Sequence, residues 1–187
     1  IHATQMTAAE TKGLAASGAV AGLCPITESN LGDGIFDGVR YLENGGRFGF
    51  GSDSNIRISL TEEIRTFEYS QRLRDHSRAA LATPASSAGR TIFERSAKGS
   101  AQAMNRGKGV LAVGNWADIL EISTDHVDME GLKDDILLDA WAFARDDRLV
   151  KNVWAAGRHR VQNGRHVKQD EITQNYRRVI HNLRAEI

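Results

Sequence analysis

The chain has 187 residues, and its 24 lysines and arginines are balanced by 24 aspartates and glutamates. This zero formal charge argues against a nucleic-acid-binding protein, which needs a basic face to neutralise phosphates. The single cysteine excludes an intrachain disulfide, and no apolar run approaches the ~18–20 residues of a membrane span. We therefore expect a cytoplasmic protein that binds neither nucleic acid nor membrane.

The first half of the chain is predicted to alternate helices and strands. Thr7 to Glu10 has the spacing of a capping box, in which a hydroxyl and a carboxylate satisfy the first free N–H groups of a helix. We expect this helix to end near Ser17. The apolar run from Val20 to Cys24 predicts a buried strand, and residues 27–34 predict a loop because they favour turn backbone.

A second strand with its helices follows. Phe36 to Glu43 predicts a short helix, and Arg47 to Gly51 predicts a second strand. Ser59 to Glu62 has the spacing of another capping box, and the helix that it opens keeps its apolar residues at helical spacing. Residues 81–90 predict a loop, and Thr91 to Met104 predicts a further helix. Such alternation is typical of a parallel βα architecture.

Beyond a boundary near Gly107 the pattern changes to strands. Ala117 to Ile122 and Val150 to Ala156 are strand candidates, and Asn163-Gly164 is a strong signal for a two-residue hairpin turn. An amphipathic helix is predicted from residue 169 to the end.

Two residues of the first half could carry chemistry. Asp53 follows the strand that ends at Gly51, and (β/α)₈ barrels place catalytic groups at such strand ends. His2 takes a comparable position if Ile1 is the last residue of a strand. A carboxylate and an imidazole that converge on one site suit metal-assisted hydrolysis. The alternative is structural, with Asp53 as a turn or cap residue and His2 as a packing residue.

The remaining candidates favour structural roles. Cys24 follows an apolar run, which favours packing over a reactive thiol. His159 and His166 flank the predicted hairpin and could face each other. The other three histidines have polar sequence neighbours, which favour surface or packing roles: His76, His126 and His181.

Taken in order, these motifs resemble the amidohydrolase superfamily. The segments that carry the resemblance are Ile1-His2-Ala3, Leu23-Cys24-Pro25, Ser29 to Gly34, Gly49 to Asp53, Val113 to Ile119 and Val153 to Arg158. Within the superfamily, residues 24–74 are similar to the formimidoylglutamate deiminases. Ile26, Thr27 and Glu28 lengthen a loop that is simpler in nucleobase deaminases.

The resemblance implies an α/β fold. Residues 1–107 would form the last strands and helices of a (β/α)₈ TIM-type barrel, residues 108–168 most of a small β-sandwich domain, and residues 169–187 a C-terminal helix. It implies an incomplete chain, because such a barrel needs roughly 250 residues. The upstream part of the same polypeptide would complete the barrel, and the enzyme would be a homodimer.

The resemblance also implies a site and a reaction. Asp53 would ligate a single Zn²⁺ ion and act as general base, and His2 would stabilise the developing charge. The other metal ligands are expected upstream of Ile1, since none of the six histidines forms a His-x-His pair. The small-molecule substrate would be a formimino amino acid, N-formimino-L-glutamate, hydrolysed to N-formyl-L-glutamate and ammonia in histidine degradation.

Two alternatives stay open at this point. One is another amidohydrolase deaminase that acts on a nucleobase-like ring. The other is a non-catalytic, barrel-derived module that binds no metal. A mononuclear zinc site needs three protein ligands, so we expect residues 1–187 alone to be inactive.

Overall fold

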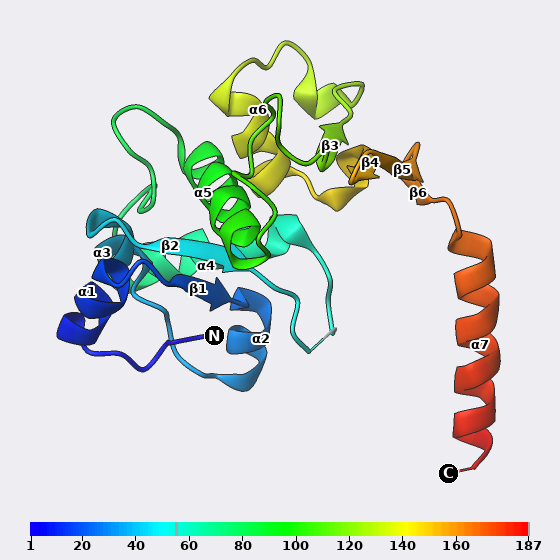
Figure 1. Ribbon diagram of the computed structural model, residues 1–187, viewed down its shortest axis with the longest axis horizontal. Helices are drawn as coiled ribbons and strands as arrows, with labels where there is room; N and C mark the ends of the chain where they lie inside the picture. The colour runs from blue at the N-terminus through cyan, green and yellow to red at the C-terminus, as the bar shows by residue number, and fades with distance from the viewer. Residues whose placement is uncertain (55, 187) are drawn as a thin grey trace. The chain divides into compact units, whose positions relative to one another are not determined.

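The computed structural model describes residues 1–54 and 56–186 (Figure 1). They form two compact units, one of Ile1–Trp116 with Thr124–Asp147 and one of Ala117–Ser123 with Arg148–Ile187. The first unit holds a parallel sheet and the second an antiparallel one, which confirms the α/β class. Among the described residues, no helix is both long enough and apolar enough to cross a membrane.

Two parallel strands form the sheet of the first unit, β1 (Val20–Leu23) and β2 (Arg47–Phe50). Their connection contains α2 (Pro25–Leu31) and α3 (Gly38–Glu43), the kind of long crossover that parallel strands require. Figure 1 shows the two strands side by side, with both arrows pointing the same way. Their carboxyl ends therefore meet at one edge of the sheet, as the sequence predicts.

Three longer helices belong to the same unit: α1 (Ala8–Ala16), α4 (Leu60–Asp75) and α5 (Ala88–Ala103). At the start of α1, Thr7 and Glu10 form both halves of the predicted capping box. At the start of α4 only one of the two hydrogen bonds of the predicted capping box forms. Ser59 accepts from the N–H of Glu62, while the Glu62 carboxylate pairs with Arg65 instead.

The core of the first unit lies between the sheet and its helices. Phe48 on β2 and Phe67 on α4 are almost fully buried and lie 5.2 Å apart between ring centroids. Helix α5 packs closely on β2 at Gly99, where an added Cβ would lie 1.9 Å from the carbonyl oxygen of Phe48. This contact leaves room only for glycine.

The loop predicted at residues 27–34 is wrong over residues 27–31, because α2 occupies Pro25–Leu31. Pro25 stands at the first helical position, where its fixed φ suits a helix and its missing N–H is not needed. The Glu28 carboxylate accepts a hydrogen bond from the Cys24 N–H at 2.8 Å and so closes the first turn. The helix ends at Gly32, at a φ of 70°.

Residues 123–149, for which the sequence indicates no element, are partly helical. They contain α6 (Asp135–Asp139), a π-helical turn over Ala140–Ala144 and 3₁₀ turns at Val127–Met129 and Asp147–Leu149. The Asp139 carboxylate accepts from the N–H of Gly89 at 2.7 Å, which ties α6 to the start of α5.

The second unit is a four-stranded antiparallel sheet in the order β3–β4–β5–β6. Its strands are β3 (Ile119–Ile122), β4 (Val150–Ala155), β5 (Arg158–Gln162) and β6 (Arg165–His166). Asn163 and Gly164 both have positive φ, as a two-residue hairpin turn requires, so the predicted hairpin is confirmed.

The predicted C-terminal helix is α7 (Gln169–Ala185), and Ile187 lies outside the described residues. The predicted domain boundaries, 1–107, 108–168 and 169–187, stay predictions, as does the second sheet of a β-sandwich.

Candidate active site

Three side chains meet at the carboxyl ends of β1 and β2. Cys24 follows β1 and Asp53 follows β2, while the backbone N–H of His2 donates to the carbonyl of Gly22 at 2.8 Å. One ligand atom of each side chain, the thiol sulfur, a ring nitrogen and a carboxylate oxygen, lies within 4.8 Å of the other two. The structure thus brings together His2 and Asp53, the two residues that the sequence singles out.

The imidazole of His2 lies between two carboxylates. Its Nε2 is 3.4 Å from Oδ2 of Asp53, and its Nδ1 is 3.2 Å from Oε1 of Glu28. Glu28 is only 5% exposed, whereas the side chains of His2 and Asp53 are partly open to solvent. One face of the site is therefore buried and fixed, and the other is accessible to a small molecule.

The backbone of the site is unusual. His2, Ala3 and Asp53 have φ values of 65°, 54° and 43°, in the left-handed region that non-glycine residues seldom adopt. Such conformations persist only where the surrounding structure holds them, and they cluster at functional sites. The positions of His2 and Asp53 agree with this pattern.

Cys24 is buried beside the site. Burial is the main cause that raises the pKa of its thiol to about 11, and the charges of Glu28, Asp53 and Glu63 act in the same direction. The thiol is therefore protonated at neutral pH, and a protonated thiol is a poor nucleophile. This agrees with the packing role predicted for Cys24.

Glu63, on the first turn of α4, adds another buried carboxyl group next to α2. Its Oε2 accepts from the N–H of Ile26 at 2.9 Å. Burial, more than the nearby charge of Glu28, raises the pKa of Glu63 to about 7, although the hydrogen bond from Ile26 opposes this.

No site role is predicted for Glu28 from the sequence. The sequence does hold a signal for it: Glu28 comes four residues after Cys24, a spacing at which one turn of helix brings a carboxylate back to a backbone N–H. Thr27 is also near the site, and its hydroxyl lies 3.4 Å from the hydroxyl of Ser54, the residue after Asp53.

The chemical types of the possible metal-ligand atoms suit zinc. Imidazole nitrogen and carboxylate oxygen are ordinary zinc ligands, and His2 and Asp53 supply one of each. By themselves, His2 and Asp53 fall short of the three protein ligands of a catalytic zinc site.

The histidines of the second unit do not form a site together. In the β5–β6 register His166 pairs with Val161, so it does not face His159, and this expectation is wrong. The ring of His159 instead stacks on Trp154, at 4.4 Å between centroids, and its Nε2 lies 2.9 Å from Oδ1 of Asn152.

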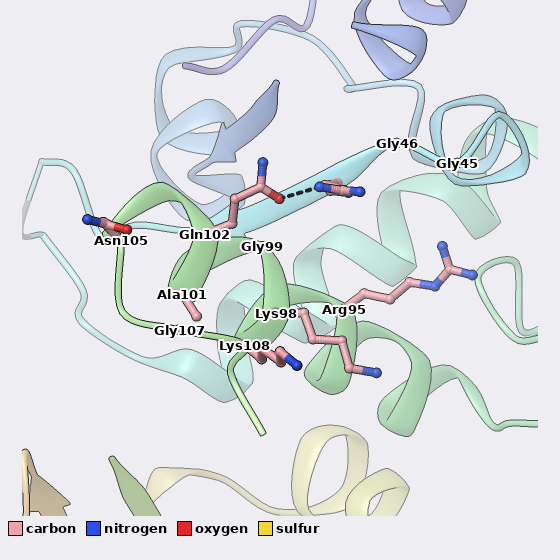
Figure 2. Close-up of a pocket in the computed structure, with 11 residues that line it drawn as sticks. Gly45, Gly46, Arg95, Lys98, Gly99, Ala101, Gln102, Asn105, Gly107 and Lys108 are labelled. Carbon is pink, nitrogen blue, oxygen red and sulfur yellow. Dashed lines mark hydrogen bonds between the residues drawn. The ribbon is translucent and has the colours of Figure 1, made fainter. Parts of the chain in front are cut away.

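A pocket of about 580 Å³ lies at the opposite end of β2, beside Arg47. It is lined by Gly45, Gly46, Arg47, Arg95, Lys98, Gly99, Ala101, Gln102, Asn105, Gly107 and Lys108. Figure 2 shows the side chains of Arg95 and Lys98 extending away from Gln102, which accepts a hydrogen bond from Arg47. The side chains of Arg95 and Lys98 therefore do not converge on Gln102, and neither His2 nor Asp53 lines this pocket.

The comparison with known families agrees with the strand-end site. Residues 1–160 match the model of the amidohydrolase family. The chain belongs to this family. The resemblance found in the sequence motifs is therefore confirmed.

Individual amidohydrolases are similar along almost the whole chain. Formimidoylglutamate deiminase from Pseudomonas aeruginosa is 43% identical over 184 residues, which are 98% of this chain and 41% of that protein. A crystal structure of an amidohydrolase from Brucella melitensis has a TM-score of 0.91 at 40% identity, over 97% of this chain and 40% of its own.

A third relative was crystallised with zinc. Atrazine chlorohydrolase from Arthrobacter aurescens has a TM-score of 0.73 at 26% identity, over 98% of this chain and 39% of its own. The chain thus spans about 40% of the length of the relatives that it matches.

Proposed function

We propose that the protein that contains this chain hydrolyses N-formimino-L-glutamate to N-formyl-L-glutamate and ammonia. The observation that carries the proposal is the 43% identity to formimidoylglutamate deiminase over 98% of the chain. The placement of His2 and Asp53, 3.4 Å apart at neighbouring strand ends, supports it because hydrolysis of an amidine needs proton transfer and charge stabilisation at one point.

The site is proposed to lie in a (β/α)₈ barrel of which β1 and β2 are two strands. The parallel pairing of β1 and β2 supports this. The segment before α1 supports it too, because a side-chain carbon of Ile1 lies 3.4 Å from the position that a Cβ on Gly22 of β1 would occupy. Three neighbouring segments then end at the same edge of the sheet, carrying His2, Cys24 and Asp53. Barrel enzymes place their active sites at this edge.

One zinc ion per site is the proposed cofactor, with Asp53 as a ligand. When bound, zinc supplies Lewis acidity and lowers the pKa of a water molecule toward ~7. Support comes from the carboxylate oxygens of Asp53, which suit zinc, and from the zinc in the structure of the chlorohydrolase. The remaining ligands are proposed to lie outside residues 1–187.

The residues of this chain would then move protons and stabilise charge. A carboxylate oxygen of Asp53 accepts a proton from the attacking water, whose oxygen bonds to the formimino carbon. Asp53 passes this proton to the terminal nitrogen, which becomes an amine. It then takes the remaining proton of the added hydroxyl and transfers it to the same nitrogen. As the bond between this nitrogen and the carbon breaks, the hydroxyl oxygen becomes the formyl carbonyl and ammonia leaves. Nε2 of His2, which faces Asp53, stabilises the charge that develops after the water attacks and before ammonia leaves.

An assay of ammonia release tests the proposal. The native polypeptide that contains residues 1–187, purified with zinc in the medium, is expected to release ammonia from N-formimino-L-glutamate and not from guanine, cytosine or adenosine. Release from one of the rings alone would overturn the substrate in favour of a nucleobase deaminase. No release from any of them, together with no bound metal, would support a non-catalytic module.

A further inference from the structure

We propose that Glu28 is a positioning residue for His2. Its carboxylate holds the hydrogen on Nδ1 of the imidazole and so presents Nε2 to Asp53 and the substrate. The inference rests on the proposed function, because it concerns the same site and deepens the role of His2 there.

The hydrogen bonds of Glu28 set the proton on the ring. Oε1 of Glu28 accepts from the backbone N–H of Cys24 at 2.8 Å and lies 3.2 Å from Nδ1 of His2. An ionised carboxylate can only accept, so Nδ1 must carry a hydrogen for this contact to be a hydrogen bond. Nε2, which faces Asp53, is then the nitrogen left for the reaction, and it can donate to a developing negative charge once the ring carries a second hydrogen there. A carboxylate orients the histidine of a Ser-His-Asp triad in the same way.

Glu28 can fix the ring because the carboxylate itself is held rigidly. Glu28 is 5% exposed, its carboxylate accepts from the N–H of Cys24, and it lies on α2, which Thr27 joins to Ser54. His2, in contrast, belongs to no helix or strand and has a φ of 65°. The orientation of its imidazole therefore depends on the side chains around it.

A purely structural role is the competing explanation, because Glu28 also closes the first turn of α2. Glu63 offers a matched control for it. Glu63 is 3% exposed, and its carboxylate accepts from the N–H of Ile26, two residues after the N–H that Glu28 binds. Glu63 differs in the one respect that matters, since Glu28 but not Glu63 contacts the ring of His2.

The test compares Glu28→Ala, Glu28→Gln and Glu63→Ala in the native polypeptide that contains residues 1–187. Kinetics with N-formimino-L-glutamate are expected to show kcat of Glu28→Ala lowered about 10- to 100-fold, with KM within about threefold of native. Glu28→Gln is expected to recover part of this loss, because its amide oxygen can still accept from Nδ1–H. For Glu63→Ala we expect kcat to stay within about threefold of native and zinc content to match that of Glu28→Ala.

Nitrogen NMR of ¹⁵N-histidine-labelled protein shows directly which ring nitrogen of His2 carries the hydrogen. The His2 signals, assigned by their loss in His2→Asn, are expected to show the hydrogen on Nδ1 in the native protein and in Glu28→Gln, and a mixture of tautomers in Glu28→Ala. A native tautomer and native kcat in Glu28→Ala would overturn the proposal, and so would equal losses of kcat in Glu28→Ala and Glu63→Ala. If the native protein does not hydrolyse N-formimino-L-glutamate, the proposed function fails, and the NMR comparison still decides whether Glu28 positions His2.

Discussion

Oε2 of Glu63 accepts a hydrogen bond from the N–H of Ile26, whereas its Oε1 is buried and has no hydrogen-bond partner among residues 1–54 and 56–186. An ionised carboxylate in this position would be poorly solvated. This explains the direction in which its pKa moves, to about 7, with burial as the largest cause. Folding thus favours the protonated form of Glu63.

The free energy of unfolding is expected to contain a contribution from Glu63 that falls as pH rises from about 5 to about 7. In this range the folded state keeps the proton that the unfolded chain has lost, since the ordinary pKa of the group is 4.5. Above pH 7 neither state holds the proton, and the decline ends. Glu63→Gln removes this contribution, which is at most about 1.4 kcal/mol per pH unit.

Urea unfolding of the native protein and of Glu63→Gln between about pH 5 and about pH 8 measures this difference. The stability of the variant relative to native is expected to increase with pH up to about 7 and then to remain constant. A difference that does not change with pH would show that Glu63 ionises normally in the folded protein.

Asp53→Asn tests the metal site. The amide keeps the size of the side chain but loses its charge and its ability to take a proton. We expect zinc content to fall and the rate of ammonia release to drop by about 10²-fold or more. Metal analysis by mass spectrometry and the ammonia assay measure the two effects. Asp33→Asn, in the segment after α2, serves as the control and is expected to match native protein; native activity and zinc in Asp53→Asn would refute the assignment.

His2→Asn separates catalysis from metal binding. Because the role proposed for His2 is charge stabilisation, its loss is expected to lower kcat about 10²- to 10⁴-fold with zinc content unchanged. The same two measurements apply. His159→Asn is the control, since that ring stacks on Trp154 in the other unit. If His2→Asn loses its zinc, His2 is a ligand and its assigned role is wrong.

The contact of α5 with β2 predicts opposite effects for two glycine substitutions. Gly99→Ala places a methyl group against the backbone of Phe48, which cannot move aside, and is expected to destabilise the protein by about 2–3 kcal/mol. Gly13→Ala, in α1, meets no atom within 4 Å and is expected to stabilise it by about 0.5–1 kcal/mol. Urea unfolding measures both, and a native midpoint for Gly99→Ala would contradict the close packing.

Local signals predict most of the fold. The capping box of Thr7 and Glu10 and the Asn163-Gly164 turn involve neighbouring residues, so the sequence alone identifies the start of α1 and the hairpin. Helix α2 is missed because several of its residues favour turns and it is held by distant partners, such as Glu63 at the N–H of Ile26. The same applies to α6, which Asp139 ties to Gly89.

The candidate site likewise contains residues that can be predicted from the sequence and one contact that cannot. The position of Asp53 follows from the strand before it, and His2 follows from the motif order, so both are predicted from the sequence. The contact of Glu28 with His2 is not, because it exists only if residues 25–31 are helical and the turn of that helix brings the carboxylate back to the strand end.

The junction between β1 and α2 restricts how the length of this chain can vary. Cys24 is the only residue between the strand and the helix. A single residue inserted there would rotate Glu28 by about 100° around the helix axis and carry its carboxylate away from His2. Homologous sequences that retain this site are therefore expected to keep the interval from Leu23 to Glu28 free of insertions and deletions, whereas residues 32–37, which join α2 to α3, can differ in number.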